Sequence, residues 1–400
     1  MKITVQKRLL IYKILLFVFA FFVAFVPSTA TRSKEVNSRV IVEILGLDGS
    51  DKISLTAQYD MPTESKDATN KDTVTVEADT VSEAVEALNT ALGRQAELGH
   101  CSIIVLGSDV KPEVLGTLMS VTDVTADVYV CAAEDKAKDF VSDVTEFMKN
   151  TGATDAQFIA YSAKRAHVAI NTMLGFLSDI GSASKSAFVP VVQMIEEQEG
   201  SGGGEQGGQS GQSGSGGGGQ GGQVGEQSGG QSKKKTGMRT EKLALYTADG
   251  RQGVLDSAGA RGVAWVSTPI ESGTVTADVE LNGETIKDVT GRLIKKSASV
   301  KVDGKSGSAT VKVKAHIEPS GDKFNILGAT NSIDATVALK AGFAKKIESE
   351  IRAAVASATE LGCDPLFIGR QFYRYEPDYF DNGFDLKNTE LKYEIDIVIK

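Results

Sequence analysis

The first part of the chain begins with short strand patterns followed by a helical one. Apolar runs at 40–45 and 53–59 flank turn-forming residues at 48–51, which predicts a β-hairpin. A third short strand is expected at 74–76. A capping-box sequence formed by Thr80 and Glu83 then introduces apolar residues at helical spacing, which predicts an amphipathic helix. The apolar residues of this helix are Val81, Val85, Leu88 and Leu92.

Strand and helix patterns continue to alternate further along. An apolar run at 101–106 predicts one strand, and apolar residues at every second position over 124–130 predict a half-buried one. A helical pattern follows, so this part of the chain is expected to mix helices and strands. Its apolar face carries Phe140, Val141, Val144, Phe147 and Met148.

The second part of the chain is dominated by period-two patterns. Apolar residues occupy every second position at 275–281 and at 311–317. In the second run the positions between them are basic. This pattern is typical of an antiparallel sheet with one face in contact with water. A long helix is predicted over 335–361, and Gly362 is its expected C-cap. Alternation returns at 391–399 in a terminal strand expected to dock into the sheet. The predicted fold class is α+β, with two globular parts of mixed strands and helices, the second an antiparallel sheet packed with one long helix.

A segment rich in Gly, Ser and Gln, residues 199–236, separates these parts. This composition cannot bury enough apolar surface to fold, so it predicts a flexible linker. The expected organisation is an N-terminal segment at 1–30, a first domain at 31–198, the linker, and a second domain at 237–400. The two domains could then change their relative position freely unless they pack on each other.

The N-terminal segment has the order of an export signal. Basic residues precede an uncharged apolar run at 14–26, whose length is typical of a signal peptide. The small residues Ser28 and Ala30 predict cleavage after Ala30. The alternative is an uncleaved anchor spanning 9–26. Either interpretation places most of the chain outside the cytoplasm, because no second apolar run of spanning length follows.

Composition and charge narrow the classes of partner. A length of 400 residues, with 41% hydrophobic and 24% charged residues, indicates an ordinary globular protein of two or three domains. The formal net charge is −9, and basic residues gather only near the N-terminus and at 233–235. A nucleic-acid partner is therefore not expected, because phosphate binding needs a concentrated cationic surface.

The residues that usually carry chemistry form no recognised motif. Cys101, Cys131 and Cys363 lie far apart and are interpreted as buried thiols, with a Cys101–Cys131 bridge as the alternative in an oxidising compartment. The three histidines have no motif partner. We therefore expect no catalytic residue, no metal site and no bound cofactor. Carboxylates brought together by the fold stay an open alternative.

Aromatic residues supply the candidate contact sites. Trp265 is the only tryptophan, and residues 367–380 are dense in aromatic side chains with arginines among them. Packing in the core is one interpretation of both features, and contact with a protein partner is the other, since these residue types are enriched at interfaces. The candidate interface residues are Trp265, Arg370, Phe372, Tyr373, Arg374 and Tyr375.

Several segments resemble one family when they are taken in order. Residues 30–37 are similar to the pattern C-W-D-x-R-E-I-N, and residues 94–107 match R-x-x-x-L-G-H followed by an apolar strand. Residues 244–265 and the sequence from 363 to 377 are similar to the start and the end of the same family's C-terminal domain. On these segments the chain resembles the C-subunit (GerAC-like) family of bacterial spore germinant receptors.

The resemblance implies a location and partners that the patterns alone do not. Members of the family are extracytoplasmic subunits of receptors in the inner spore membrane, where they work with A-type and B-type membrane subunits in nutrient-triggered germination. The expected protein is thus a membrane-associated, non-enzymatic receptor subunit. Ala30 stands where typical members carry a lipid-modified cysteine, so the usual anchor is missing unless 14–26 stays uncleaved and replaces it. This departure favours, as the alternative, a secreted or envelope-anchored binding or structural protein that has lost the receptor role.

Overall fold

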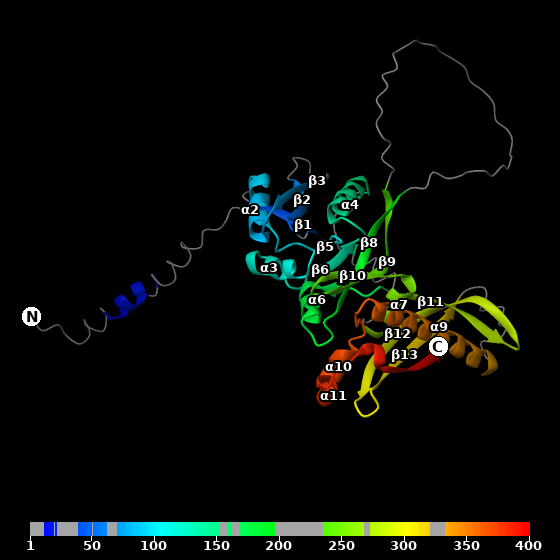
Figure 1. Ribbon diagram of the computed structural model, residues 1–400. Helices are drawn as coiled ribbons and strands as arrows, with labels where there is room; N and C mark the ends of the chain where they lie inside the picture. Colours follow the sequence, from blue (N-terminus) through cyan, green and yellow to red (C-terminus); the bar gives the residue numbers. More distant parts are fainter. Residues whose placement is uncertain are drawn as a thin grey trace, which may run out of the picture.

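The computed structural model describes residues 12–19, 21, 39–49, 51–61, 70–151, 159, 161, 168–196, 235–267, 273–320 and 333–400. These residues form two α+β units, each built on one sheet (Figure 1). The expected cleavage site at Ala30 and nearly all of the expected linker lie outside the described residues. Within the described ranges, no helix is long and apolar enough to cross a membrane.

The first unit contains a ten-stranded mixed sheet. Its main path runs β10-β9-β8-β6-β5-β1-β2-β3, with β4 beside β1 and β7 beside β6. The central strands β1, β5, β6 and β8 run parallel, and the strands toward both edges are antiparallel. The strands are β1 (Arg39–Asp48), β2 (Ile53–Met61), β3 (Asn70–Ala78), β4 (Gln95–Glu97), β5 (Ile103–Leu106), β6 (Tyr129–Ala133), β7 (Asn171–Thr172), β8 (Ala187–Glu196), β9 (Lys235–Thr247) and β10 (Gly250–Leu255).

Helices cover both faces of this sheet (Figure 1). Ile103 and Val105 of β5 pack in the apolar cluster of α4, whereas Ile104 and Leu106 pack on the other face with α2, α3 and α6. A strand buried on both faces needs apolar residues at every position, which is why this stretch is a continuous apolar run. The helices are α2 (Val81–Leu92), α3 (Glu113–Val121), α4 (Ala137–Thr151) and α6 (Met173–Ile180).

Most of the expected elements of this unit are present. The hairpin of β1 and β2 is confirmed, and the Thr80 hydroxyl accepts a hydrogen bond from the Glu83 amide at 3.2 Å, as the capping sequence predicts. The strand expected over 124–130 is wrong, because β6 begins only at Tyr129. Val124 and Val128 lie in an irregular segment before the strand, and their side chains are buried in the core. Their alternating apolar pattern therefore marks buried positions that are not paired in a sheet.

The second unit is a four-stranded sheet with one long helix, as predicted. Strands follow the order β11-β12-β13-β14, and α9 packs its apolar face, including Phe343, Ile347 and Ile351, against the sheet. The terminal strand docks parallel to β13, and the other pairs are antiparallel. Gly362 follows α9 at φ 69°, as a C-cap requires. The elements are β11 (Gly273–Leu281), β12 (Glu284–Asp303), β13 (Ser308–Ser320), α9 (Ile333–Glu360), α10 (Ile368–Tyr375), α11 (Pro377–Asp381), η2 (Leu386–Asn388) and β14 (Glu390–Ile399).

The two units share strands and a core at their junction. β9 and β10 follow the Gly-rich segment in sequence but belong to the first sheet, where β9 pairs with β8 from Ala187↔Tyr246 to Glu196↔Lys235. α7 (Ser257–Ser267) then packs against both β9 and α9. The two parts of the chain therefore pack on each other, which removes the free relative movement that a linker alone would allow. The shared apolar cluster includes Phe188, Leu243, Leu245, Val263, Ala354 and Ala358.

Candidate functional site

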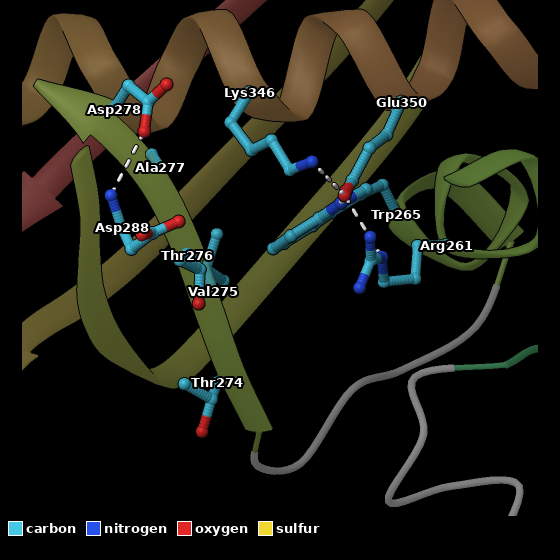
Figure 2. Close-up of a pocket in the computed structure, with 10 residues that line it drawn as sticks. All are labelled: Arg261, Trp265, Thr274, Val275, Thr276, Ala277, Asp278, Asp288, Lys346 and Glu350. Carbon is cyan, nitrogen blue, oxygen red and sulfur yellow. Dashed lines mark hydrogen bonds and ion pairs between the residues drawn. The ribbon is translucent and has the colours of Figure 1, made fainter. Parts of the chain in front are cut away.

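A cavity of about 320 Å³ lies in the second unit between α7, α9 and β11 (Figure 2). Its walls come together because α7 and α9 approach closely at Gly262, where an added Cβ would lie only 2.1 Å from the Glu350 carbonyl oxygen. Only glycine permits this contact. The cavity is lined by Arg261, Trp265, Thr274, Val275, Thr276, Ala277, Asp278, Asp288, Lys346 and Glu350.

A buried carboxylate organises one end of the cavity. The side chain of Glu350 is 4% exposed, and its Oε2 accepts a hydrogen bond from Trp265 Nε1 at 2.8 Å. Its Oε1 forms ion pairs with Arg261 Nε at 3.0 Å and with Lys346 Nζ at 3.3 Å. A buried charge is tolerated only when it is paired, and these three contacts supply the partners. They also hold three side chains from two helices around one carboxylate.

Two aspartates occupy the other end of the cavity. Asp278 and Asp288 lie at the irregular register of β11 and β12, and Asp278 Oδ1 accepts a hydrogen bond from the Asp288 amide at 3.0 Å. Asp288 has φ 55°, a left-handed conformation that Asp and Asn adopt more readily than most residues. Figure 2 shows these aspartates on the opposite side of the view from Glu350 and Arg261. Both aspartates are exposed, and Asp278 also lines an adjoining cavity together with Lys345 and Lys346.

The described residues offer no further chemistry of the kinds weighed from the sequence. No group of three or more side chains that could hold a metal ion occurs among them. The three cysteines are free and buried, so the alternative of a Cys101–Cys131 bridge is wrong. Burial raises the pKa of Cys101 and of Cys131 to about 12 and that of Cys363 to about 11. These thiols are therefore protonated near neutral pH.

Two of the candidate interface residues are buried, and a third, Arg370, is partly exposed at the junction of the two units. Trp265 forms part of the cavity wall and Phe372 is fully buried in the second core. Arg370 joins the two units, because its Nη1 donates to Asp179 Oδ1 of α6 at 3.0 Å and its guanidinium lies over the Phe367 ring at 4.0 Å. These contacts are all within the chain.

The other three candidates lie together on the exposed face of α10. Tyr373 is 58% exposed and Tyr375 is 60% exposed, with Arg374 between them in sequence and its guanidinium 5.3 Å from the Tyr375 ring centroid. The rings of Tyr373 and Phe380 form a T-shaped pair with centroids 5.4 Å apart, which places Tyr373 against α11. A contact of this surface with a partner stays a prediction.

The sequence patterns did not single out Arg261, Lys346 or Glu350. One signal was present, since Glu350 lies three residues after Ile347 and four before Ala354 on the apolar face of α9. A charged residue on the buried face of a helix needs a partner. The identity of that partner depends on which helix packs there, and this long-range contact is not contained in the local pattern.

The fold and the cavity together show that this is an α+β protein of two units, with a cavity lined by charged side chains in the second unit. Residues 32–194 match the family model described as the spore germination protein N-terminal domain. Residues 241–400 match the model described as spore germination B3/GerAC like, C-terminal. The chain therefore belongs to the GerAC-like family of spore germination proteins.

Among solved structures, the chain is similar to the crystal structure of the GerBC protein. The TM-score is 0.48 at 14% sequence identity, and the match covers 89% of this chain and 96% of that chain. No curated protein sequence matches the chain.

Proposed function

We propose that this chain is the extracytoplasmic, membrane-associated C subunit of a nutrient germinant receptor, in complex with A-type and B-type membrane subunits. The observation that carries this proposal is the presence of both family domains, in order, over residues 32–194 and 241–400. Export by the N-terminal segment and retention by an uncleaved 14–26 would place both domains on the outer side of the inner spore membrane. The role is binding and assembly, without catalysis.

The exposed face of α10 is the proposed contact with a receptor partner. Tyr373, Arg374 and Tyr375 combine large rigid rings with a guanidinium, the combination most often found at the energetic centre of protein interfaces. α10 is supported from behind by Phe372, whose ring lies 4.8 Å from Tyr379 and 5.2 Å from Phe384. A surface held rigid in this way loses little side-chain entropy when a partner binds.

The test is affinity capture of the tagged full chain from detergent-solubilised spore membranes, with mass spectrometry of the captured proteins. We expect A-type and B-type subunits to be recovered. The double variant Tyr373→Ser/Tyr375→Ser should reduce their recovery about ten-fold or more, as loss of two central aromatics does at other interfaces. Leu174→Ser, at an exposed apolar residue of α6, is the matched control and should leave recovery unchanged.

The alternative function is that of a secreted or envelope-anchored binding or structural protein. Ala30 at the position of the lipid-modified cysteine favours it. The N-terminal peptide in the same mass spectrum separates the two functions. An intact 14–26 peptide together with both partners supports the receptor subunit. A free N-terminus at Thr31, with the protein in the soluble fraction and no receptor partner, overturns it.

A further inference from the structure

We propose that the open edge of β14 binds an extended segment of a partner protein, with Lys or Arg at every second position, as an added strand of the second sheet. β14 is the last strand in the order β11-β12-β13-β14, and no described strand pairs with its other side. The inference rests on the regularity of this edge, on the direction of its amides and on its charge. It does not depend on the proposed receptor role.

The backbone of β14 is suited to pairing along its whole length. Its register with β13 runs without interruption over all 10 residues, which include neither proline nor glycine. The Lys400 amide donates to the Ile317 carbonyl oxygen of β13 at 3.1 Å. Because successive amides of a strand point to opposite sides, the amides of Ile395 and Ile397 point away from β13, where an added strand can accept hydrogen bonds from them.

The other open edges of the two sheets carry features that oppose such pairing. In β10, at one edge of the first sheet, the register is interrupted between Arg251 and Gly253. In β3, at the opposite edge, the side chain of Lys71 is only 1% exposed and forms ion pairs inside the molecule. The pairing of β11 with β12 is also interrupted. Bulges and inward-pointing charges protect an edge strand, and β14 has neither, since its inward side chains are all apolar.

The charged face of β14 indicates the kind of strand that it would accept. Glu394 forms an ion pair with Lys312 of β13, and Asp396 forms one with Lys314 at 2.9 Å. Each pair places its lysine on β13 and its carboxylate on the open edge. The Glu394 and Asp396 side chains are 58% and 62% exposed, so a second cation can reach them from the other side. A strand with Lys or Arg at alternate positions repeats these pairs, and opposite charges across two strands stabilise a sheet.

A second copy of the chain fits this edge poorly. Two β14 strands paired antiparallel about Glu394 set this carboxylate against itself. Pairing about Tyr393 sets Glu390 against Asp396, and pairing about Ile395 sets Glu394 against Asp396. Like charges directly opposite each other destabilise a strand pair, so the occupant is a different chain with a basic face.

The experiment uses a synthetic strand as the probe. The peptide TKVKVKVT, labelled with a fluorophore, is titrated with the full chain in detergent, and TEVEVEVT is the matched control. We expect a saturable rise in fluorescence anisotropy with TKVKVKVT at a Kd on the order of 100 μM, and binding of TEVEVEVT about ten-fold weaker or less. Hydrogen exchange over residues 390–399 should slow when TKVKVKVT is bound, because the outward amides gain acceptors.

A pair of variants tests the charge of the edge. Glu394→Gln/Asp396→Asn removes both carboxylates and should weaken binding of TKVKVKVT about five-fold or more. Glu280→Gln/Glu318→Gln removes two acidic residues of the same sheet outside β14 and should leave binding unchanged. Exposed ion pairs contribute little to stability, so both variants should fold.

The proposal is overturned if TKVKVKVT does not bind, if it binds no better than TEVEVEVT, or if its binding leaves exchange over 390–399 unchanged. It is also overturned if the chain alone forms a dimer that protects 390–399, because a second copy would then occupy the edge. The capture of receptor subunits is measured separately, so failure of this edge and failure of the receptor role are distinguished.

Discussion

At the scale of single residues, Glu350 is a buried charged residue in the long helix of the second unit. It is a charged residue at a position where the helical pattern calls for an apolar one, and three polar contacts compensate for its burial. Such a residue does not add stability over an apolar side chain of similar size. Its effect is to fix the indole of Trp265 and two cations in one geometry, which is the requirement of a preformed binding site.

Replacement of Glu350 by Gln is therefore expected to destabilise the chain. The change leaves Arg261 and Lys346 without a counter-charge, and because both are partly exposed we expect a loss of about 2 kcal/mol, less than for a fully buried pair. Urea unfolding followed by Trp265 fluorescence measures this loss. Glu348→Gln, two residues before Glu350, removes the ion pair with Arg352 one turn further along α9 and should cost less than about 0.5 kcal/mol. Equal costs for the two variants would contradict this account of Glu350.

At the scale of elements, local signals predicted the ends of helices and the position of the hairpin turn. Thr80 caps α2 and Gly362 ends α9 because the chemistry involved lies within a few residues of each end. Residues 124–128 show the limit of such signals, since alternating burial arose there ahead of the strand that pairs, which begins at Tyr129. The start of α10 could not be predicted locally either. The carboxylate that binds its first amides is held in place by a loop of the first unit, which is a long-range contact.

That carboxylate belongs to Asp364. It accepts hydrogen bonds from the amides of Ile368 at 3.0 Å and Gly369 at 2.7 Å, and from the Ser184 hydroxyl at 2.7 Å. The Ser186 hydroxyl in turn accepts from the Asp364 amide at 2.9 Å. Burial raises the pKa of Asp364, and its hydrogen bonds oppose that rise. One side chain therefore both starts α10 and ties it to the first unit.

We expect Asp364→Ala to cost about 3 kcal/mol, because it leaves the buried amides of Ile368 and Gly369 in the first turn of α10 without an acceptor. Hydrogen exchange should accelerate over 368–375 more than over the rest of the second unit. Asp385→Ala, which removes the cap of the exposed turn η2, is the comparison and should cost about 1 kcal/mol or less. Unchanged exchange in α10 after Asp364→Ala would show that this carboxylate does not hold the helix.

At the scale of the whole molecule, the composition of the sequence located the Gly-rich segment. It did not show that the strands directly after this segment belong to the first sheet. β9 and β10 complete the first sheet, and the apolar cluster around Leu243 and Val263 continues into α9. The partner of a strand is set by contacts between residues far apart in sequence, so periodicity could identify β8 and β9 without showing that they pair. For the same reason, Trp265 was visible in the sequence and its partners in the cavity were not.

A protease site inserted between Gly217 and Gly218 tests this pairing. After cleavage we expect the two fragments to elute together in size-exclusion chromatography, because the β8–β9 ladder and the shared core remain. Leu243→Asp places an unpaired charge in that core and should separate the cleaved fragments. Separation of the cleaved chain without this substitution would mean that only the covalent connection holds the units together.

The pairing of Glu196 with Lys235 has a consequence for how this chain can vary in length. The two ends of the Gly-rich segment are held about 5 Å apart, the distance between neighbouring strands, whatever lies between them. Each doubling of such a connection costs only about 0.6 kcal/mol. This point of the fold can therefore gain or lose sequence, or accept an inserted reporter domain, with little effect on the sheets or on the cavity.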